Sequence, residues 1–110
     1  MSLVYAGVCS HGPGMTGRAH LVENTARRDE LFAHMDTMRR EIAASGAEAL
    51  LVVAAEHFAN FFMNNMPAFC IGMADSYEGP IEDEAFLHIR RTTVPGNKAL
   101  SRRLIENVMQ

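Results

Sequence analysis

The 110-residue chain lacks the features that mark several broad classes of protein. No apolar run approaches the roughly 20 residues of a membrane-spanning helix, and Met1-Ser2 leads into an apolar segment that does not resemble a signal peptide. The chain has two cysteines, Cys9 and Cys70, both within apolar segments where small buried thiols are common. The formal charge of −3 gives no general attraction to nucleic acid. We therefore expect a soluble, cytoplasmic protein without membrane or nucleic-acid partners.

What the chain does contain is a pair of apolar runs separated by a helical pattern. Residues 3–9 and 50–55 are apolar and are followed by loop-like sequence. The second run shows no alternation, which is typical of a strand covered on both faces. Between the runs, apolar side chains recur every three or four residues, at Leu31, Met35, Met38 and Ile42. This order predicts an α/β fold with a mainly parallel sheet flanked by helices, which begins as a βαβ unit.

The helix predicted over residues 24–45 has signals for its start and its end. Asn24 or Thr25 is suited to cap the start, and Gly46 is suited to follow the end. The stretch at residues 12–17 is too rich in glycine to be helical, so we expect a binding loop or lid there.

Further elements are expected in the second half of the chain. Residues 68–74 are a third strand candidate, residues 75–84 form an acidic loop, and residues 86–94 resemble an edge strand. After a turn at residues 95–97, a second helix carries apolar residues on one face, at Leu100, Leu104, Ile105 and Val108. This helix shows no stop signal, so we expect residues 1–110 to be one α/β domain, or part of one, that ends inside an element.

Two histidines lie just past the first two apolar runs. His11 follows residues 3–9, and His57 follows residues 50–55. Open parallel sheets bind ligands beyond the carboxyl ends of their strands, so both imidazoles are expected at one edge of the sheet. Two histidines and one carboxylate, with coordination positions left open, describe non-haem iron(II) oxygenases. The alternative is that both are ordinary polar residues at strand ends.

The third ligand is not singled out by the sequence. Glu56 is adjacent to His57, and adjacent strand residues point to opposite faces, so we do not expect them to coordinate together. The acidic loop supplies five other carboxylates that are either ligand candidates or simply solvated: Asp75, Glu78, Glu82, Asp83 and Glu84.

Other patterns are weaker. Cys9 or Ser10 near His11 suggests a nucleophile and a base, but no orienting acid or oxyanion hole is marked. The Gly-Pro-Gly that follows lacks the spacing of a nucleotide-binding loop. Four apolar residues could line a pocket for a flat aromatic substrate or belong to the core: Phe58, Phe61, Phe62 and Met66. The remaining histidines are interpreted as structural or surface residues: His20, His34 and His88.

Several segments together resemble one family. They are Ser10-His11-Gly12-Pro13, Val52-Val53-Ala54-Ala55-Glu56-His57, Asn60-Phe61-Phe62, Asn65-Met66-Pro67-Ala68-Phe69-Cys70-Ile71-Gly72 and Val94-Pro95-Gly96-Asn97. In this order they resemble the class III extradiol ring-cleavage dioxygenases, in particular catalytic beta subunits of the protocatechuate 4,5-dioxygenase type. The resemblance runs through nearly the whole chain and corresponds to the amino-terminal part of the family's domain.

The resemblance implies that His11 and His57 are ligands of an iron(II) ion. It further implies that a glutamate far downstream completes the site and that a downstream histidine is the acid-base catalyst, and neither has a counterpart in this chain. The implied substrates are O2 and a small aromatic diol, and an oligomer or a partner subunit is expected. Two alternatives remain open: a non-catalytic module for metal binding or subunit assembly, and a zinc-using relative, because two histidines also suit zinc.

Overall fold

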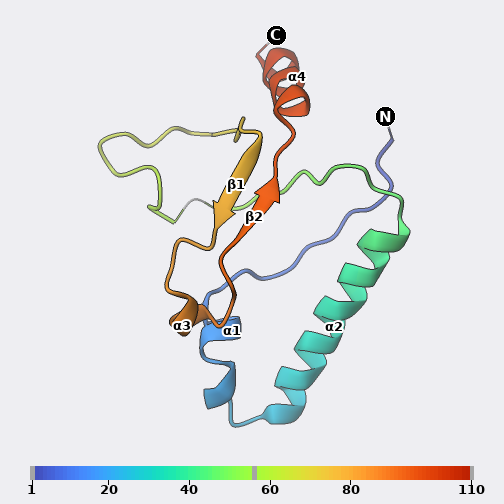
Figure 1. Ribbon diagram of the computed structural model, residues 1–110, viewed down its shortest axis with the longest axis vertical. Helices are drawn as coiled ribbons and strands as arrows, with labels where there is room; N and C mark the ends of the chain where they lie inside the picture. The colour runs from blue at the N-terminus through green and yellow to red at the C-terminus, as the bar shows by residue number, and fades with distance from the viewer. Residues whose placement is uncertain (1, 56, 110) are drawn as a thin grey trace. The chain divides into compact units, whose positions relative to one another are not determined.

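The computed structural model describes residues 2–55 and 57–109. Its elements are α1 (Gly14–Gly17), the short 3-10 helix η1 (Ala19–Leu21), α2 (Thr25–Ala44), β1 (Ser76–Gly79), α3 (Glu84–Leu87), β2 (Thr92–Pro95) and α4 (Lys98–Val108) (Figure 1). The chain divides into unit 1, which comprises Met1–Glu48 and Gly79–Thr92, and unit 2, which comprises Ala49–Glu78 and Thr93–Gln110.

The longest element of unit 1 is α2, and it begins and ends at its sequence signals. The side chain of Asn24 accepts a hydrogen bond from the backbone N–H of Arg27 at 3.1 Å and so caps the first turn. At the other end, the Ser45 hydroxyl donates to the carbonyl of Ile42 at 2.7 Å. Gly46 follows with φ of +72°, which glycine adopts without steric cost. The predicted helix and its caps are confirmed.

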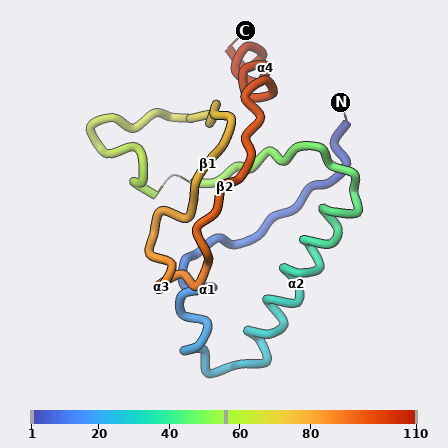
Figure 2. The backbone as a smooth tube through the Cα atoms, viewed as in Figure 1, coloured from blue at the N-terminus to red at the C-terminus, as the bar shows by residue number. Residues whose placement is uncertain are grey.

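The amino-terminal segment of unit 1 is irregular chain that contacts α2 (Figure 2). The Tyr5 hydroxyl donates to Glu41 Oε2 at 3.1 Å. A Cβ on Gly7 would lie 2.9 Å from the Tyr5 ring and 3.3 Å from the sulfur of Met38, so glycine makes room for this contact. Desolvation, together with the hydrogen bond to Glu41 and the negative charge of Glu41, raises the pKa of Tyr5 above its ordinary value.

A small packed cluster forms where α1 meets α3 in unit 1 (Figure 1). Gly17 and Leu87 are buried there, and the Leu87 side chain is only 5% exposed. A Cβ on Gly17 would lie 2.5 Å from the backbone carbonyl oxygen of Phe86, so the close approach of α1 to α3 depends on the missing side chain. Among the described residues, Leu87 is the one buried hydrophobic side chain.

Two local predictions for this region are wrong. The glycine-rich stretch at residues 12–17 contains α1, because Met15 N–H and Gly17 N–H bond back to the carbonyls three and four residues earlier, at 3.0 Å each. The expected edge strand at residues 86–94 begins instead with α3, since Asp83 Oδ1 accepts from Ala85 N–H at 2.8 Å and caps a helical turn. Only β2, at the end of that stretch, is a strand.

The sheet of the described residues has two antiparallel strands, β1 and β2. The predicted mainly parallel sheet flanked by helices, with its βαβ start, is therefore wrong. Residues 3–9, 50–55 and 68–74 are irregular in the described part of the chain. A parallel sheet needs apolar cover on both faces, and the one long helix between the first two runs, α2, has no buried residue in this structure.

The apolar runs are consequently left open to solvent. Val8 is 99% exposed, Val53 is 91% exposed and Phe69 is 95% exposed. Phe58, Phe62 and Met66, for which core and pocket roles were considered, are exposed as well, and Phe61 is half-buried. Across residues 2–55 and 57–109, none of the helices combines the length and apolar character needed to cross a membrane.

Unit 2 is organised around Tyr77 of β1. The Tyr77 hydroxyl oxygen accepts a hydrogen bond from the backbone N–H of Ala74 at 3.1 Å. A Cβ on Gly72 would lie 2.6 Å from that oxygen, and one on Gly96 would collide with the Ala74 carbonyl. Gly96 N–H also donates to the Asp75 carbonyl at 2.8 Å. These close approaches join the chain before β1 to the turn after β2.

The predicted carboxyl-terminal helix is confirmed as α4. The Asn97 side chain accepts a hydrogen bond from the Leu100 backbone N–H at 3.0 Å and caps its start. Met109 follows the last helical residue. Leu100, Leu104 and Ile105 are half-buried, whereas Val108 is exposed.

Candidate functional site

His11 lies in unit 1, between the irregular amino-terminal segment and α1. Its side chain is exposed. The chain turns directly after it, since the Gly12 carbonyl accepts the Met15 N–H at 3.0 Å and the Pro13 carbonyl accepts the Gly17 N–H at 3.0 Å. His11 thus lies just before α1, where a non-helical loop was expected, and the strand expected before it is irregular chain.

His57 lies in unit 2 and is also exposed. The run at residues 50–55 is irregular, so the expected position at a strand end is wrong for this histidine too. Phe58 has φ of +58°, in the left-handed region that non-glycine residues seldom adopt. Backbone strain of this kind is concentrated at functional sites in proteins. His11 and His57 belong to different units.

The candidate third ligands have varied surroundings. In unit 1, Asp83 caps α3 and Glu84 Oε1 accepts a backbone N–H at 2.6 Å, so both carboxylates have structural roles. Asp75 borders a pocket in unit 2. The other two candidates are exposed: Glu78 and Glu82. The prediction that the Glu56 side chain points away from His57 lies outside the described residues.

The side chains of His11 and His57 are of a type that binds metal ions. Two imidazoles suit iron(II) or zinc, and both rings are solvent-accessible. Within the part of the chain that the structure describes, no group of three or more histidine, cysteine, aspartate or glutamate side chains is placed to hold a metal ion. The side chains of His11 and His57 are therefore of a type that binds iron(II) or zinc. The carboxylate that would be the third ligand is not identified among the described residues.

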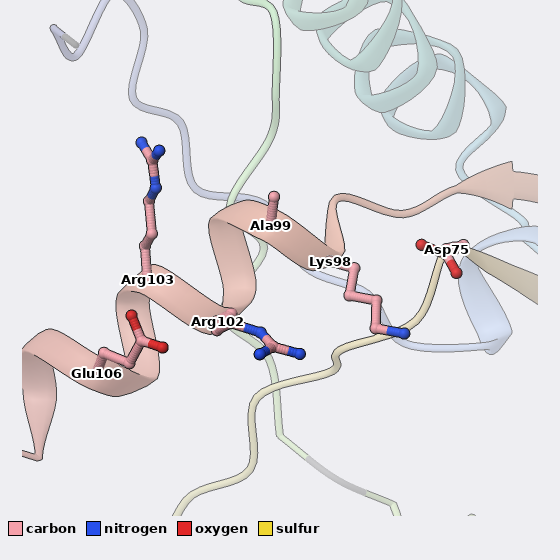
Figure 3. A pocket seen from close by; sticks show the side chains of 6 residues that line it. All are labelled: Asp75, Lys98, Ala99, Arg102, Arg103 and Glu106. Carbon is pink, nitrogen blue, oxygen red and sulfur yellow. The ribbon is translucent and has the colours of Figure 1, made fainter.

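A pocket of about 490 Å³ lies in unit 2 beside the start of α4 (Figure 3). Its lining residues are Asp75, Lys98, Ala99, Arg102, Arg103 and Glu106. Lys98 and Arg102 extend to the same side of the helix, whereas Arg103 extends in another direction. The lining contains three positive and two negative side chains, and all five are exposed. The pocket therefore has a surface of mixed charge that is well solvated.

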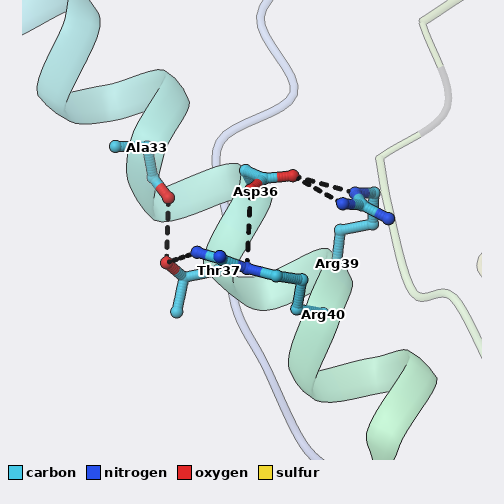
Figure 4. Close-up of polar contacts among 5 residues, drawn as sticks. All are labelled: Ala33, Asp36, Thr37, Arg39 and Arg40. Atoms are coloured by element: carbon cyan, nitrogen blue, oxygen red, sulfur yellow. Dashed lines mark hydrogen bonds and ion pairs between the residues drawn. The ribbon is translucent and has the colours of Figure 1, made fainter.

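A polar network lies along α2 (Figure 4). Arg39 donates two hydrogen bonds to Asp36 Oδ1, at 3.0 and 2.8 Å, and Arg40 Nε lies 3.4 Å from Asp36 Oδ2. Thr37 accepts from Arg40 at 3.2 Å and donates to the Ala33 carbonyl at 3.0 Å. The hydrogen bonds from Arg39 lower the pKa of Asp36. Pairs one turn apart stabilise a helix surface, so these charges have a structural role.

Two histidines that the sequence places far apart are brought together in unit 1. The rings of His20, in η1, and His88, directly after α3, have centroids 5.8 Å apart and planes at 85°. The sequence predicted structural or surface residues at both positions and contains no signal that pairs them, because the contact depends on how α1 packs on α3. His34 remains on α2, with Nε2 3.8 Å from Glu30 Oε1.

The suggested nucleophile-base arrangement involves Cys9, Ser10 and His11, and all three residues are exposed. Cys9 is exposed and is not in a disulfide.

No protein-family model, curated protein sequence or solved structure matches the chain. Function is therefore inferred from the residues of this chain.

Proposed function

We propose that this chain carries the two-histidine half of the metal site of a non-haem iron(II)-dependent extradiol dioxygenase. The observation that carries the proposal is the order of sequence segments around His11 and His57, with the Asn65–Gly72 and Val94–Asn97 segments behind them. Two exposed imidazoles on loops and a strained residue directly after His57 support it.

His11 and His57 would hold the metal in this proposal. Neutral imidazoles bind iron(II) and contribute no charge, so a carboxylate is needed to complete the ligand set. When bound, the iron supplies a centre on which O2 and both oxygens of a catechol-type diol come together. The two side chains of this chain occupy few coordination positions, which leaves space for the substrates. Both histidines lie on accessible loops, so a diol can reach them without opening a core.

The first experiment measures iron(II) binding without turnover. The protein is titrated anaerobically with iron(II), and the bound ion is detected through its paramagnetic nitric oxide adduct. We expect His11→Ala and His57→Ala each to abolish the signal of the site. His34→Ala is the matched control, because His34 is an exposed histidine on α2 outside the proposed site. Unchanged iron binding by both site variants would contradict the proposal.

The second experiment separates the dioxygenase from its alternatives. Oxygen uptake and ring-cleavage products are measured with a panel of catechols, on the 110-residue chain and on any longer polypeptide that contains this sequence. Iron-dependent uptake in the longer polypeptide, lost in His57→Ala, is the expected result. Iron binding without turnover there would identify a non-catalytic module. Stable zinc binding with zinc-dependent activity would identify a zinc-using relative.

A further inference from the structure

The contact between His20 and His88 joins two segments of unit 1 through side chains that bind metals. The ring centroids are 5.8 Å apart, and both side chains are exposed. Neither residue belongs to the proposed iron site.

Local structure fixes the backbone on both sides of this contact. Around η1, Leu21 N–H donates to the Arg18 carbonyl at 3.0 Å. On the other side, His88 N–H donates to the Glu84 carbonyl at 2.8 Å, and His88 adopts φ of 55°, which ends α3. The packing of α1 on α3 at Gly17 holds these two turns against each other.

We propose that His20 and His88 form a binding site for a divalent transition-metal ion such as Zn²⁺ or Cu²⁺. Each ring nitrogen binds such an ion at about 2 Å, so two imidazoles on one ion have centroids roughly 5 to 6 Å apart. The observed 5.8 Å falls within this range. Rotation about the Cβ–Cγ bond is broad for histidine, so either ring nitrogen can be turned toward a shared ion.

Two carboxylates that precede His88 in unit 1 are already engaged. Asp83 Oδ1 accepts the Ala85 N–H, and Glu84 Oε1 accepts the Arg91 N–H. No third histidine, cysteine or carboxylate joins the pair within the described residues. The site therefore has two protein ligands, and water completes the coordination of the ion.

This donor set determines which ions bind. Imidazole affinity for divalent ions follows the order Mn²⁺ < Co²⁺ < Ni²⁺ < Cu²⁺ > Zn²⁺, whereas Mg²⁺ and Ca²⁺ prefer oxygen ligands. A bound ion ties η1 to the end of α3 and stabilises their packing, because it binds the packed form alone.

The test follows each histidine ring separately. The 15N-labelled chain is titrated with Zn²⁺ at neutral pH, and the imidazole nitrogens are observed by NMR. We expect the His20 and His88 signals to change together, with one midpoint. The variant His88→Asn removes the ring and retains a residue that tolerates positive φ. In this variant the Zn²⁺ affinity at His20 should fall at least about tenfold, because the second ligand, which acts at a high effective concentration, is lost. His20→Gln should weaken binding at His88 equally.

Controls make the outcome independent of the iron proposal. His34→Ala should leave the shared midpoint unchanged, and backbone amide spectra of each variant report whether unit 1 keeps its fold. The signals of His11 and His57 are resolved in the same titration, so their behaviour tests the proposed function and not this site. Equal Zn²⁺ affinity at His20 with and without the His88 ring, in a folded variant, would overturn the inference. A Mg²⁺ response equal to that of Zn²⁺ would do the same.

Discussion

The packing of α1 on α3 depends on one glycine, and its substitution gives a quantitative test. Gly17→Ala adds a methyl group 2.5 Å from the backbone carbonyl oxygen of Phe86, which cannot move aside as a flexible side chain could. Gly14→Ala is the matched control in the same short helix, since an added Cβ there meets nothing within 4 Å. Neither glycine has a positive φ, so both backbones accept alanine.

The two substitutions are expected to change stability in opposite directions. An extra methyl group in a tight contact costs about 1 to 3 kcal/mol, which lowers the population of the packed cluster by roughly five- to 150-fold. Replacing Gly14 with alanine removes backbone freedom in the unfolded chain and should stabilise α1 by about 0.5 to 1 kcal/mol.

Native-state amide exchange measures the difference. The N–H groups of Leu87 and His88 donate to the carbonyls of Asp83 and Glu84 at 3.0 and 2.8 Å, so their exchange reports on α3. In Gly17→Ala their protection should fall, and Zn²⁺ affinity at the two-histidine site should fall with it. Equal protection in the two glycine variants would refute the packing argument.

Three further predictions follow. The pKa of Asp36 is lowered, so its contribution to the stability of α2 is present above its unfolded pKa and is lost as pH falls through its folded pKa. Arg39→Gln should raise the NMR titration midpoint of Asp36. An unchanged midpoint would contradict this expectation. Asn97→Ala should cost about 1 kcal/mol and reduce amide protection of Leu100, which the side chain of Asn97 caps. The 110-residue chain alone should show no appreciable oxygen uptake with iron(II) and catechols, because its described residues include no complete metal-binding group.

Helices were predictable from this sequence because their signals are local. The spacing of apolar residues in α2 and its cap Asn24 act within one or two turns, and the structure confirms them. Asn97 caps α4 in the same local way, although the sequence predicted it only in the turn before the helix. The signal for α3 was also present, because Asp83 is a favoured N-cap residue, but the apolar residues after it favoured a strand interpretation.

The sheet was not predictable in the same way, because strands depend on distant partners. Residues 50–55 have the composition of a buried parallel strand, yet a strand forms only where neighbouring strands and covering helices are supplied. In the structure this run is irregular and exposed. The pairing of His20 with His88 was missed for a related reason, since a contact between turns far apart in sequence has no local pattern.

The prediction that His11 and His57 share one iron is tested most directly by counting imidazoles on the metal. The nitric oxide adduct of iron(II) is prepared in protein carrying His20→Ala, so that the second site does not contribute. Electron spin echo measurements on histidine-labelled protein then report the coordinated nitrogens. We expect two imidazoles on one iron, and loss of the adduct signal after either His11→Ala or His57→Ala. Two imidazoles retained in either variant would contradict the account.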